Sequence, residues 1–344
     1  MRRGVAVAAA FALVAATGCG HGRKHQKTFS IRLKAVPPAG HRLTPQDLDR
    51  SVVIMRRRLE RLGISEAEVR EQGADVIVIG FASRRERATA GAVVGKKGLL
   101  EFYDFEAHLA GPSASGPSRS PGAIGSLYDL LAAPQTHALA RKGASQWYLF
   151  DARRRVARGP TSAKKLLGPG SKGSTILAVP AQTVVVTCNA RVGNCLSTRQ
   201  VSTKKGYYLF KQGPELTGAD LELSGTRADQ DPQTGSPVVI FQFTDRGKRV
   251  FQEITRREAQ RGALACGGSR SADAVPRCAQ HFAIVLDHEL ESAPYIDFLR
   301  NPNGIPGDSG AQIDVGAGGS MREAKRLALL LHTGALPVQF VRLR

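Results

Sequence analysis

The sequence is poor in residues that stack on nucleic acid bases and in apolar runs long enough to cross a membrane. One tryptophan and 6% aromatic residues among 344 leave few side chains for base stacking. Beyond residue 22 the most apolar candidate for a membrane span, Leu327–Leu331, is five residues long. A spanning helix needs about 20, so we expect the body of the chain to contain no such helix.

Acidic residues are scarce relative to basic ones. The 29 Asp and Glu residues stand against 49 Lys and Arg, for a formal charge of +20 and a pI near 10.3. Such a charge fits a polyanionic partner, which could be nucleic acid or an anionic lipid surface. A hydrophobic content of 42% excludes wholesale disorder, and the length suits one large domain or two ordinary ones.

The first residues have the pattern of a targeting signal. Arg2 and Arg3 precede the apolar run Val5–Ala16, a pattern typical of a secretory signal peptide. Small residues then lead to Cys19, an order that resembles a bacterial lipobox, in which the cysteine is acylated and becomes the first mature residue. We expect a signal peptide over 1–18 and a lipidated basic tether over 19–28. The alternative is an ordinary signal peptide followed by an incidental Cys19.

The expected export signal favours anionic lipid over nucleic acid as the polyanionic partner. Removing residues 1–18, which contain Arg2 and Arg3, leaves a formal charge of +18, so the basic excess belongs to the exported body. Beside the extracytoplasmic face of a cell membrane, that charge favours association with anionic lipid, which salt screens within about 10 Å at 0.1 M. We expect a lipid-anchored protein at that surface, or otherwise a secreted cell-envelope protein, with no nucleic acid partner.

The remaining cysteines form two sequence-local groups, Cys188 with Cys195 and Cys266 with Cys278. Four cysteines allow three connectivities, and an exported protein meets an oxidising compartment. The local connectivity closes short loops at the least entropic cost. Neither group has the Cys-x-x-Cys spacing of a zinc knuckle, so disulfides are favoured over a metal site.

Strand and helix patterns alternate through the first hundred residues. Apolar alternation predicts strands over 29–35, 75–81 and 99–105, with helices beginning at Pro45 and Arg84. The first of these helices has a complete start signal.

Thr44 can cap it, Pro45 suits its first position, and Asp47 completes a capping box. Gly63 is a natural stop. Leu48, Val52, Met55, Leu59 and Leu62 form the buried stripe of this helix, and its arginines, Arg58 among them, are expected on solvated faces.

Further along, residues 110–145 are rich in Gly, Pro, Ser and Ala and predict a linker or loosely structured insert. Strand and helix patterns return after 214, and 301–319 reads as a Gly/Pro loop. Ser320 and Glu323 form a second capping box, which opens a helix that Gly334 closes.

Several motifs resemble catalytic sites only superficially. Gly307–Gly310 spells part of a serine-protease loop, but no histidine has the local setting that such a triad requires. Gly91–Lys97 has three residues between its glycines instead of the four of a phosphate-binding loop. His281 and His288 lack a metal-binding acid pattern. We therefore expect no enzyme and no cofactor, and a hydrolase using Ser309 is the least favoured alternative.

Three blocks, in order, resemble the large extracytoplasmic domain of the SecD family, the accessory subunit of the bacterial protein-export machinery. The first is LTPQDLDRSVVIMRRRLERLGISEAEVREQGADVIVIGF at 43–81, continued by VVGKKGLLEF at 93–102. The second comprises PELTGADL at 214–221, VVIFQFTDRGKRVFQEITRRE at 238–258 and FAIVLDHELESAPYI at 282–296. The third is REAKRLALLLHTGALPVQF at 322–340.

The resemblance implies an α+β, two-lobed fold. A ferredoxin-like base lobe would comprise 29–105 and 320–344, with an inserted α+β head lobe at 206–319. Between them, 106–205 would be a Gly/Pro/Ser-rich linker and a short β-rich insert. In SecD-like proteins such a domain is thought to engage the emerging polypeptide, with the head moving relative to the base.

The resemblance also has departures. The family's transmembrane helices have no counterpart in the sequence, so we expect a stand-alone form without the proton-driven motor. Asp287-His288 stands where the family commonly has Asp-Gly in a hairpin turn, and because His tolerates a left-handed backbone less well than Gly, we expect a changed turn type.

Two functions follow. The leading hypothesis is a non-enzymatic, membrane-tethered domain in protein export that binds exported or unfolded polypeptide, or the translocon subunits. The alternative is a diverged cell-envelope lipoprotein that uses the same fold as a scaffold or ligand-binding module.

Overall fold

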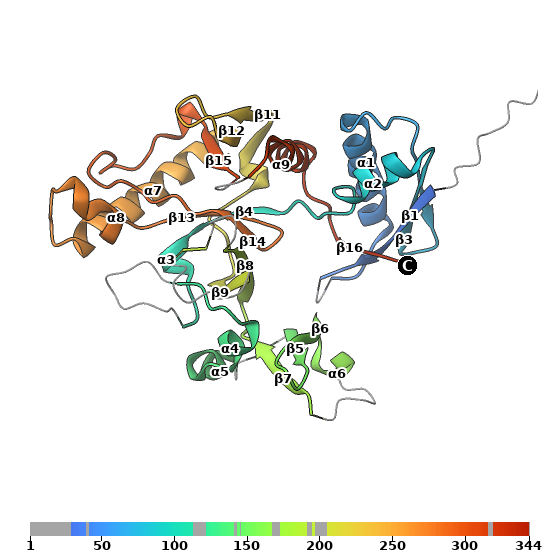
Figure 1. Cartoon of the computed structure of the whole chain (residues 1–344), viewed down its shortest axis with the longest axis horizontal. Coiled ribbons are helices and arrows are strands. Elements are labelled where there is room, and N and C mark those ends of the chain that lie inside the picture. Colours follow the sequence, from blue (N-terminus) through green and yellow to red (C-terminus); the bar gives the residue numbers. More distant parts are fainter. Residues whose placement is uncertain are drawn as a thin grey trace, which may run out of the picture.

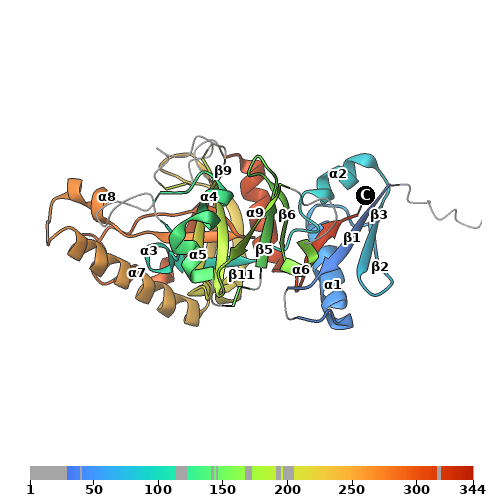
Figure 2. The same ribbon diagram turned by 90° about the horizontal axis from the view of Figure 1, so that it is seen from below.

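The computed structural model describes residues 29–38, 41–112, 122–140, 143–144, 146–166, 173–190, 195–196, 205–315 and 319–343. The expected signal peptide, and the tether with Cys19, lie outside these residues. The chain forms a mixed α/β architecture of four sheets with helices packed on them (Figures 1 and 2). Within the described ranges, no helix combines the length and apolar character needed to span a bilayer.

A four-stranded antiparallel sheet joins the two ends of the chain. Its order is β16-β1-β3-β2, from β1 (Phe29–Val36), β2 (Glu68–Gln72), β3 (Val76–Phe81) and β16 (Gln339–Arg342). Alternate β1 residues Ile31, Leu33 and Ala35 are buried, as one covered face requires. We call this sheet, with α1 (Pro45–Arg61) and α2 (Arg84–Gly91), the four-stranded unit.

Helix α1 begins where the sequence predicts. Thr44 accepts a hydrogen bond from the Asp47 N–H, and the Asp47 carboxylate accepts one from the Thr44 N–H, so the predicted capping box is confirmed. The helix ends at Arg61, and Gly63 follows in the left-handed region with φ of 72°. Its apolar stripe packs on the sheet, with Met55 and Leu59 almost fully buried.

A six-stranded sheet occupies the middle of the molecule and has apolar cores on both faces. Phe102 and Ile284 belong to one core, and Tyr103 and Val285 to the other, because successive strand residues point to opposite faces. The strand order is β10 (Leu216–Thr217), β4 (Leu100–Asp104), β13 (Phe282–Leu286), β14 (Glu289–Ser292), β8 (Thr183–Asn189) and β9 (Lys205–Lys211). The short helix α3 (Phe105–His108) follows β4 directly.

A three-stranded sheet, β11 (Leu221–Gln230), β12 (Pro237–Phe243) and β15 (Ala311–Asp314), shares the first of these cores. The long helix α7 (Asp245–Ala265) packs there too, followed by α8 (Val275–Cys278). Strand β15 lies inside 301–319, where the sequence indicated only a loop. The four-residue strand was obscured by the glycines and prolines on either side of it.

Helix α9 (Met321–Thr333) starts at the predicted Ser320–Glu323 capping box, which is confirmed. Its buried Ala324, Leu327, Ala328 and Leu331 pack with β11 and β12. The sequence assigned this helix and residues 99–105 to the base lobe, which stays a prediction: α9 packs with β11 and β12 and also contacts α1 of the four-stranded unit. The apolar stripe showed which face of α9 is buried, not what covers it.

A third layer lies within residues 106–205. Strands β5 (Gln146–Phe150), β6 (Val156–Thr161) and β7 (Thr175–Val179) form a sheet in the order β6-β5-β7. Helices α4 (Leu127–Ala132), α5 (Pro134–Ala140) and α6 (Ala163–Leu166) accompany them, and α4 buries Leu127, Leu130 and Leu131 at helical spacing. The part of 110–145 expected to be loosely structured therefore contains two helices. We call this layer the insert sheet.

Both cysteine pairs are joined locally. Cys188 bridges Cys195 with Cα atoms 5.2 Å apart, and Cys266 bridges Cys278 with Cα atoms 5.5 Å apart. The first bridge is buried beside β8 and β9, and the second ties the end of α7 to α8. Each bridge closes a loop within one layer of the fold.

Candidate binding cleft

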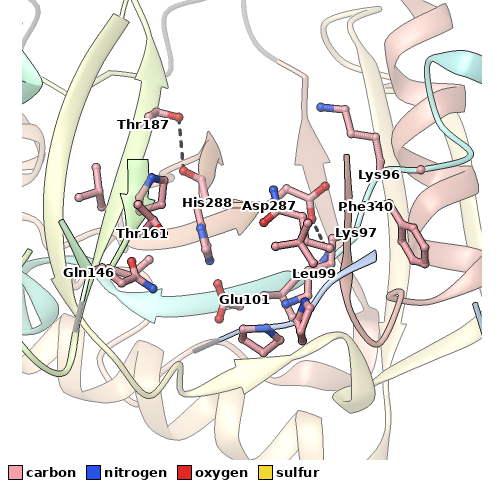
Figure 3. A pocket seen from close by; sticks show the side chains of 18 of the residues that line it. Lys96, Lys97, Leu99, Glu101, Gln146, Thr161, Thr187, Asp287, His288 and Phe340 are labelled. Atoms are coloured by element: carbon pink, nitrogen blue, oxygen red, sulfur yellow. Dashed lines mark hydrogen bonds between the residues drawn. The ribbon is translucent and has the colours of Figure 1, made fainter. Parts of the chain in front are cut away.

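A cleft of about 1040 Å³ lies where the four-stranded unit, the six-stranded sheet and the insert sheet meet. We call it the central cleft; Figure 3 shows it from close by. Apolar and polar side chains from all three layers line it, among them Leu33, Val94, Lys97, Glu101, Leu127, Tyr148, Lys165, Thr187, His288 and Phe340.

The floor of the cleft comes from β4. Glu101 and Tyr103 lie two residues apart and share one face of that strand, whereas Phe102 points into the core behind it. Burial raises the pKa of the Glu101 carboxyl, and a hydrogen bond with Tyr103 opposes that rise. Its Oε2 atom has no hydrogen-bond partner among the described residues. A half-buried acid of this kind can bind an incoming hydrogen-bond donor.

The His288 side chain points toward Glu101 (Figure 3), from the turn between β13 and β14, the two strands that follow β4 in the same sheet. Asp287 and His288 have φ of 51° and 65°, both left-handed, as a two-residue type I′ hairpin requires. The expected change of turn type is therefore wrong: the histidine adopts the backbone that Gly would supply. Neighbouring hydrogen bonds hold it there.

Those hydrogen bonds tie the turn to two other segments. The Leu99 N–H donates to Asp287 Oδ1 at 2.8 Å, and the Asp287 N–H donates to the Leu99 carbonyl at 2.9 Å. On the other side, the Thr187 N–H donates to the His288 carbonyl at 2.8 Å. The turn thus joins strand β8 to the segment that leaves the four-stranded unit.

Arg58 holds both covalent connections between the four-stranded unit and the rest of the molecule. Those connections are the segments 95–99 and 334–338. The Arg58 side chain, fully buried on α1, donates to the carbonyl oxygens of Val93, Val94, Lys96, Lys97 and Gly334 and to Thr333 Oγ1. The Leu336 N–H also donates to the Lys97 carbonyl at 2.7 Å, so the two segments bond to each other.

Burial lowers the pKa of Arg58 to about 10, which still leaves the guanidinium charged at neutral pH. The expectation that this arginine is solvated is wrong. Arg58 lies three residues after Met55 and one before Leu59, at the border of the apolar stripe. This position in the sequence indicated burial, because residues three apart on a helix lie on the same face, and Met55 is on the buried one.

The charged groups around the cleft are mostly basic. Lys96, Lys97, Lys165 and Arg342 line it, against the acids Glu101 and Asp287. Asp287 is already engaged with the Leu99 N–H. Apolar walls with a few polar groups and a basic rim suit the binding of a flexible, acidic ligand.

His281 and Gly307–Ser309, two of the superficial matches to catalytic or metal motifs, do not line the cleft. Among the described residues, no group of three or more His, Cys, Asp or Glu side chains could hold a metal ion. His281 is buried away from the cleft and pairs with Glu106, its Nδ1 lying 2.6 Å from Oε1. Gly307–Ser309 forms a short 3-10 turn on β12 and α7. Residues 91–97 end α2 and then accept the Arg58 hydrogen bonds, which gives that glycine-containing stretch a structural role.

The four cysteines predicted to form disulfides do not line the cleft. The structure brings Cys188 to Cys195 and Cys266 to Cys278, but none of the four contributes to its walls. The candidate lipidation site, Cys19, lies outside the described residues. Glu101 and His288, which do line the cleft, come instead from strand alternation and a hairpin turn, and Arg58, at the border of a helix stripe, binds the segments that lead to it.

Comparison with known proteins now adds the family. Residues 194–338 match the family model described as the SecDF P1 head subdomain, and residues 48–107 match the N-terminal part of the P1 domain of protein translocase subunit SecDF. The chain is thus SecD-like: these matches show similarity to the P1 domain of SecD and SecDF translocase subunits.

Curated proteins named protein translocase subunit SecD are similar to this chain. The protein translocase subunit SecD of Elusimicrobium minutum is 24% identical over 84% of this chain and 44% of its own length. That of Streptomyces coelicolor is 25% identical over 90% of this chain and 58% of its own length. The chain thus spans about half the length of the curated relatives it matches. A solved SecDF structure, described as a membrane component that enhances protein export, covers 92% of this chain and 98% of its own, with 21% identity and a TM-score of 0.47.

Proposed function

We propose that this chain takes part in protein export by binding exported polypeptide in the central cleft. The observation that carries the proposal is the cleft itself, which three layers of the fold enclose and which has apolar walls and a basic rim. Similarity to the SecD family supports the process, since the curated relatives are named as translocase subunits. The role is non-enzymatic: it needs a surface that holds an unfolded segment, not a reacting group.

The proposed architecture is two-lobed. The four-stranded unit, with the order β16-β1-β3-β2 and two helices on one face, would be the ferredoxin-like base lobe. The six-stranded sheet, the sheet of β11, β12 and β15, and helices α7 and α9 would form the inserted head lobe. The boundary then falls in the two segments that Arg58 holds, at 95–99 and 334–338.

The proposed location is the extracytoplasmic face of the membrane, with the chain anchored by lipid on Cys19. The formal charge of +18 on residues 19–344 would favour contact with anionic lipid there. Mass spectrometry of the mature N-terminus tests the anchor: an acylated Cys19 is expected, and an unmodified Cys19 thiol would refute it. The translocon subunits are the proposed partners.

Photo-crosslinking in growing cells tests the central claim. A photoreactive amino acid in place of Tyr148, which lines the cleft, should crosslink to secretory precursors in membranes. The matched control is the same amino acid in place of Leu264, which lies at the end of α7 with 80% of its surface exposed and does not line the cleft. Equal crosslinking at both positions, or at neither, would contradict binding in the cleft.

Depletion of the protein tests the process. Slower secretion of precursors is the expected result, measured by pulse labelling. Unchanged secretion kinetics would instead favour the alternative, a diverged cell-envelope lipoprotein that uses the same fold as a scaffold or ligand-binding module.

A further inference from the structure

Strand β16 is the edge of the four-stranded sheet that borders the central cleft. In the strand order β16-β1-β3-β2 it pairs with β1 alone among the described residues. Gln339, Phe340 and Arg342 line the cleft. In Figure 1, β16 lies on the side of its sheet that faces the middle of the molecule, and Figure 2 shows β2 on the far side. The unpaired edge of β16 therefore opens toward the cleft.

The register shows which backbone groups are unpaired. The Leu343 N–H donates to the Arg32 carbonyl at 2.9 Å, so these two residues form a hydrogen-bonded pair. Hydrogen-bonded and non-bonded pairs alternate along an antiparallel ladder, which puts Val341 and Gln339 in bonded pairs with β1 as well. Phe340 and Arg342 fall between them and direct their N–H and C=O groups away from β1, toward the cleft.

The opposite neighbour of β1 gives an independent check on this assignment. The Ala35 N–H donates to the Asp75 carbonyl at 2.7 Å, so Ala35 bonds on its β3 side and not on its β16 side. Ala35 is the partner of Phe340 in the register. The Phe340 backbone groups consequently have no partner in β1, and no hydrogen bond from them to another described residue is present.

Side chains leave this edge accessible. Phe340 as a whole residue is 8% exposed and packs in the core of the four-stranded unit, and Figure 3 shows its ring turned away from Glu101 and His288. The neighbouring residues Gln339 and Arg342 are exposed, so β16 has accessible surface where it borders the cleft.

Two other sheet edges, those of β2 and β6, carry residues that hinder pairing with another chain. The far edge of the four-stranded sheet, β2, carries Glu68, Arg70 and Glu71. Strand β6, which borders the cleft from the insert sheet, contains Pro160, a residue without an N–H. Charges and proline are the usual means by which proteins prevent an edge from pairing with another chain.

We propose that an exported polypeptide binds by adding an extended, carboxylate-bearing strand to the open edge of β16. The pairing would use the N–H and C=O groups of Phe340 and Arg342, as in other cases of strand addition. Charge selects the occupant: Lys96, Lys97, Lys165 and Arg342 line the cleft that this edge borders, so a strand with acidic side chains is complementary. The inference rests on the proposed function and gives it a binding mode and a sequence preference.

Main-chain pairing explains how one site could accept many sequences, since every residue except proline offers the same backbone groups. The basic rim would then supply the bias among them. Neither feature requires a deep pocket for one particular side chain.

A pair of variants at one position separates the backbone from the charge. Arg342→Ala removes the guanidinium and keeps the N–H, whereas Arg342→Pro removes both and leaves the ladder with β1 intact, because that N–H points outward. The probe is a short fluorescent peptide that alternates valine and glutamate, bound to the full chain and followed by fluorescence anisotropy. Arg342→Ala should weaken binding a few-fold, and Arg342→Pro should weaken it about tenfold further, the loss of one backbone hydrogen bond.

A second measurement needs no change to the protein, so it remains decisive if Arg342→Pro fails to fold. A peptide N-methylated on alternate residues should bind about tenfold more weakly when the methyl groups face β16, and equally well when they face the other way. A peptide with lysine in place of glutamate should bind more weakly than either acidic peptide. Equal affinity for both N-methylated peptides would overturn strand addition.

The charge-reversal variant Lys165→Glu, on the opposite wall, distinguishes failure of the binding mode from failure of the function. If Lys165→Glu weakens binding but the N–H of Arg342 does not matter, the cleft binds polypeptide without strand pairing and the inference falls alone. If neither wall affects binding, the proposed function falls with it. Weakening by both is the expected result.

Discussion

The Arg58 guanidinium donates a hydrogen bond of 2.8 Å to the carbonyl oxygen of Gly334, a residue 276 positions further along the chain. The same side chain bonds to the carbonyl oxygens of Val93, Val94, Lys96 and Lys97 on the other connecting segment. One buried arginine thereby fixes the place where both connections leave the four-stranded unit. Its hydrogen-bond partners are these carbonyl oxygens and the Thr333 hydroxyl.

Replacing Arg58 should be among the most destabilising changes in α1. Arg58→Leu would leave several buried carbonyl oxygens unpaired, and we expect the free energy of unfolding to fall by about 3 kcal/mol or more. The matched control is Arg57→Leu, an exposed arginine on the same helix, which should change it by less than about 0.5 kcal/mol. Urea denaturation measures both, and similar losses in the two variants would contradict the assignment.

Glu258 on α7 should make stability depend on pH. This side chain is fully buried, and neither carboxylate oxygen has a hydrogen-bond partner among the described residues. Burial, with Asp104 and Glu106 nearby, raises the pKa of Glu258 well above its ordinary value of 4.5, while Arg261 and Arg257 oppose the rise. The folded protein therefore keeps this proton to a higher pH than the unfolded chain.

The sign follows from that difference. The contribution of Glu258 to stability is greatest below about pH 4.5 and is lost as the pH rises through its folded-state pKa. Glu258→Gln should abolish this loss, gaining about 1.4 kcal/mol at high pH for each unit of pKa shift removed. Urea midpoints measured across pH for both proteins check it. Glu253→Gln, on the same helix beside Arg256, is the control, because the pKa of Glu253 is lowered.

The two disulfides should differ in how readily they are reduced. Cys188 and Cys195 are 1% and 4% exposed, whereas Cys266 and Cys278 are only partly buried at the end of α7. Under native conditions a small thiol reductant should open the Cys266–Cys278 bridge first, as alkylation and mass spectrometry would show. Replacing Cys188 and Cys195 by serine should lower stability by about 2 kcal/mol. Faster reduction of the buried bridge would contradict this order.

The hairpin turn offers a stabilising substitution. His288 has a left-handed backbone with φ of 65°, which costs an L-residue about 1 kcal/mol relative to Gly. His288→Gly should therefore raise the free energy of unfolding by up to about 1 kcal/mol, measured by thermal or urea unfolding. Asp287→Ala serves as the contrast: it removes the acceptor of the Leu99 N–H and should destabilise by about 1 kcal/mol. A destabilised His288→Gly would mean that the imidazole makes a compensating contact.

Local signals in the sequence predicted local structure well. The capping boxes at Thr44 and Ser320 identified the starts of α1 and α9, because each depends on residues only three apart. Long-range placement was harder. The stripe of α9 predicted burial but not its cover of β11 and β12, and the four residues of β15 were too few to stand out among glycines and prolines.

The cleft could be predicted only in part. The alternation of Glu101 with Phe102 was readable, but the meeting of β4, β16 and the insert sheet depends on contacts between residues far apart in sequence. Arg58 shows the same limit. A run of arginines is usually solvated, and its burial depends on carbonyl oxygens that only the folded backbone brings together.

The position of β16 has a consequence for the order of folding. Strand β1 pairs with β3 within the first hundred residues, but its other neighbour, β16, which pairs Gln339 with Val36, is synthesised much later. During synthesis, the four-stranded sheet therefore lacks β16 until the intervening sheets have been made. Over that interval one edge of β1 has no pairing strand. Such a distant pairing slows folding and prolongs the exposure of that edge. A chaperone that covers the open edge of β1 during this interval would not speed its pairing with β16. It would, however, keep nascent chains from associating through that edge.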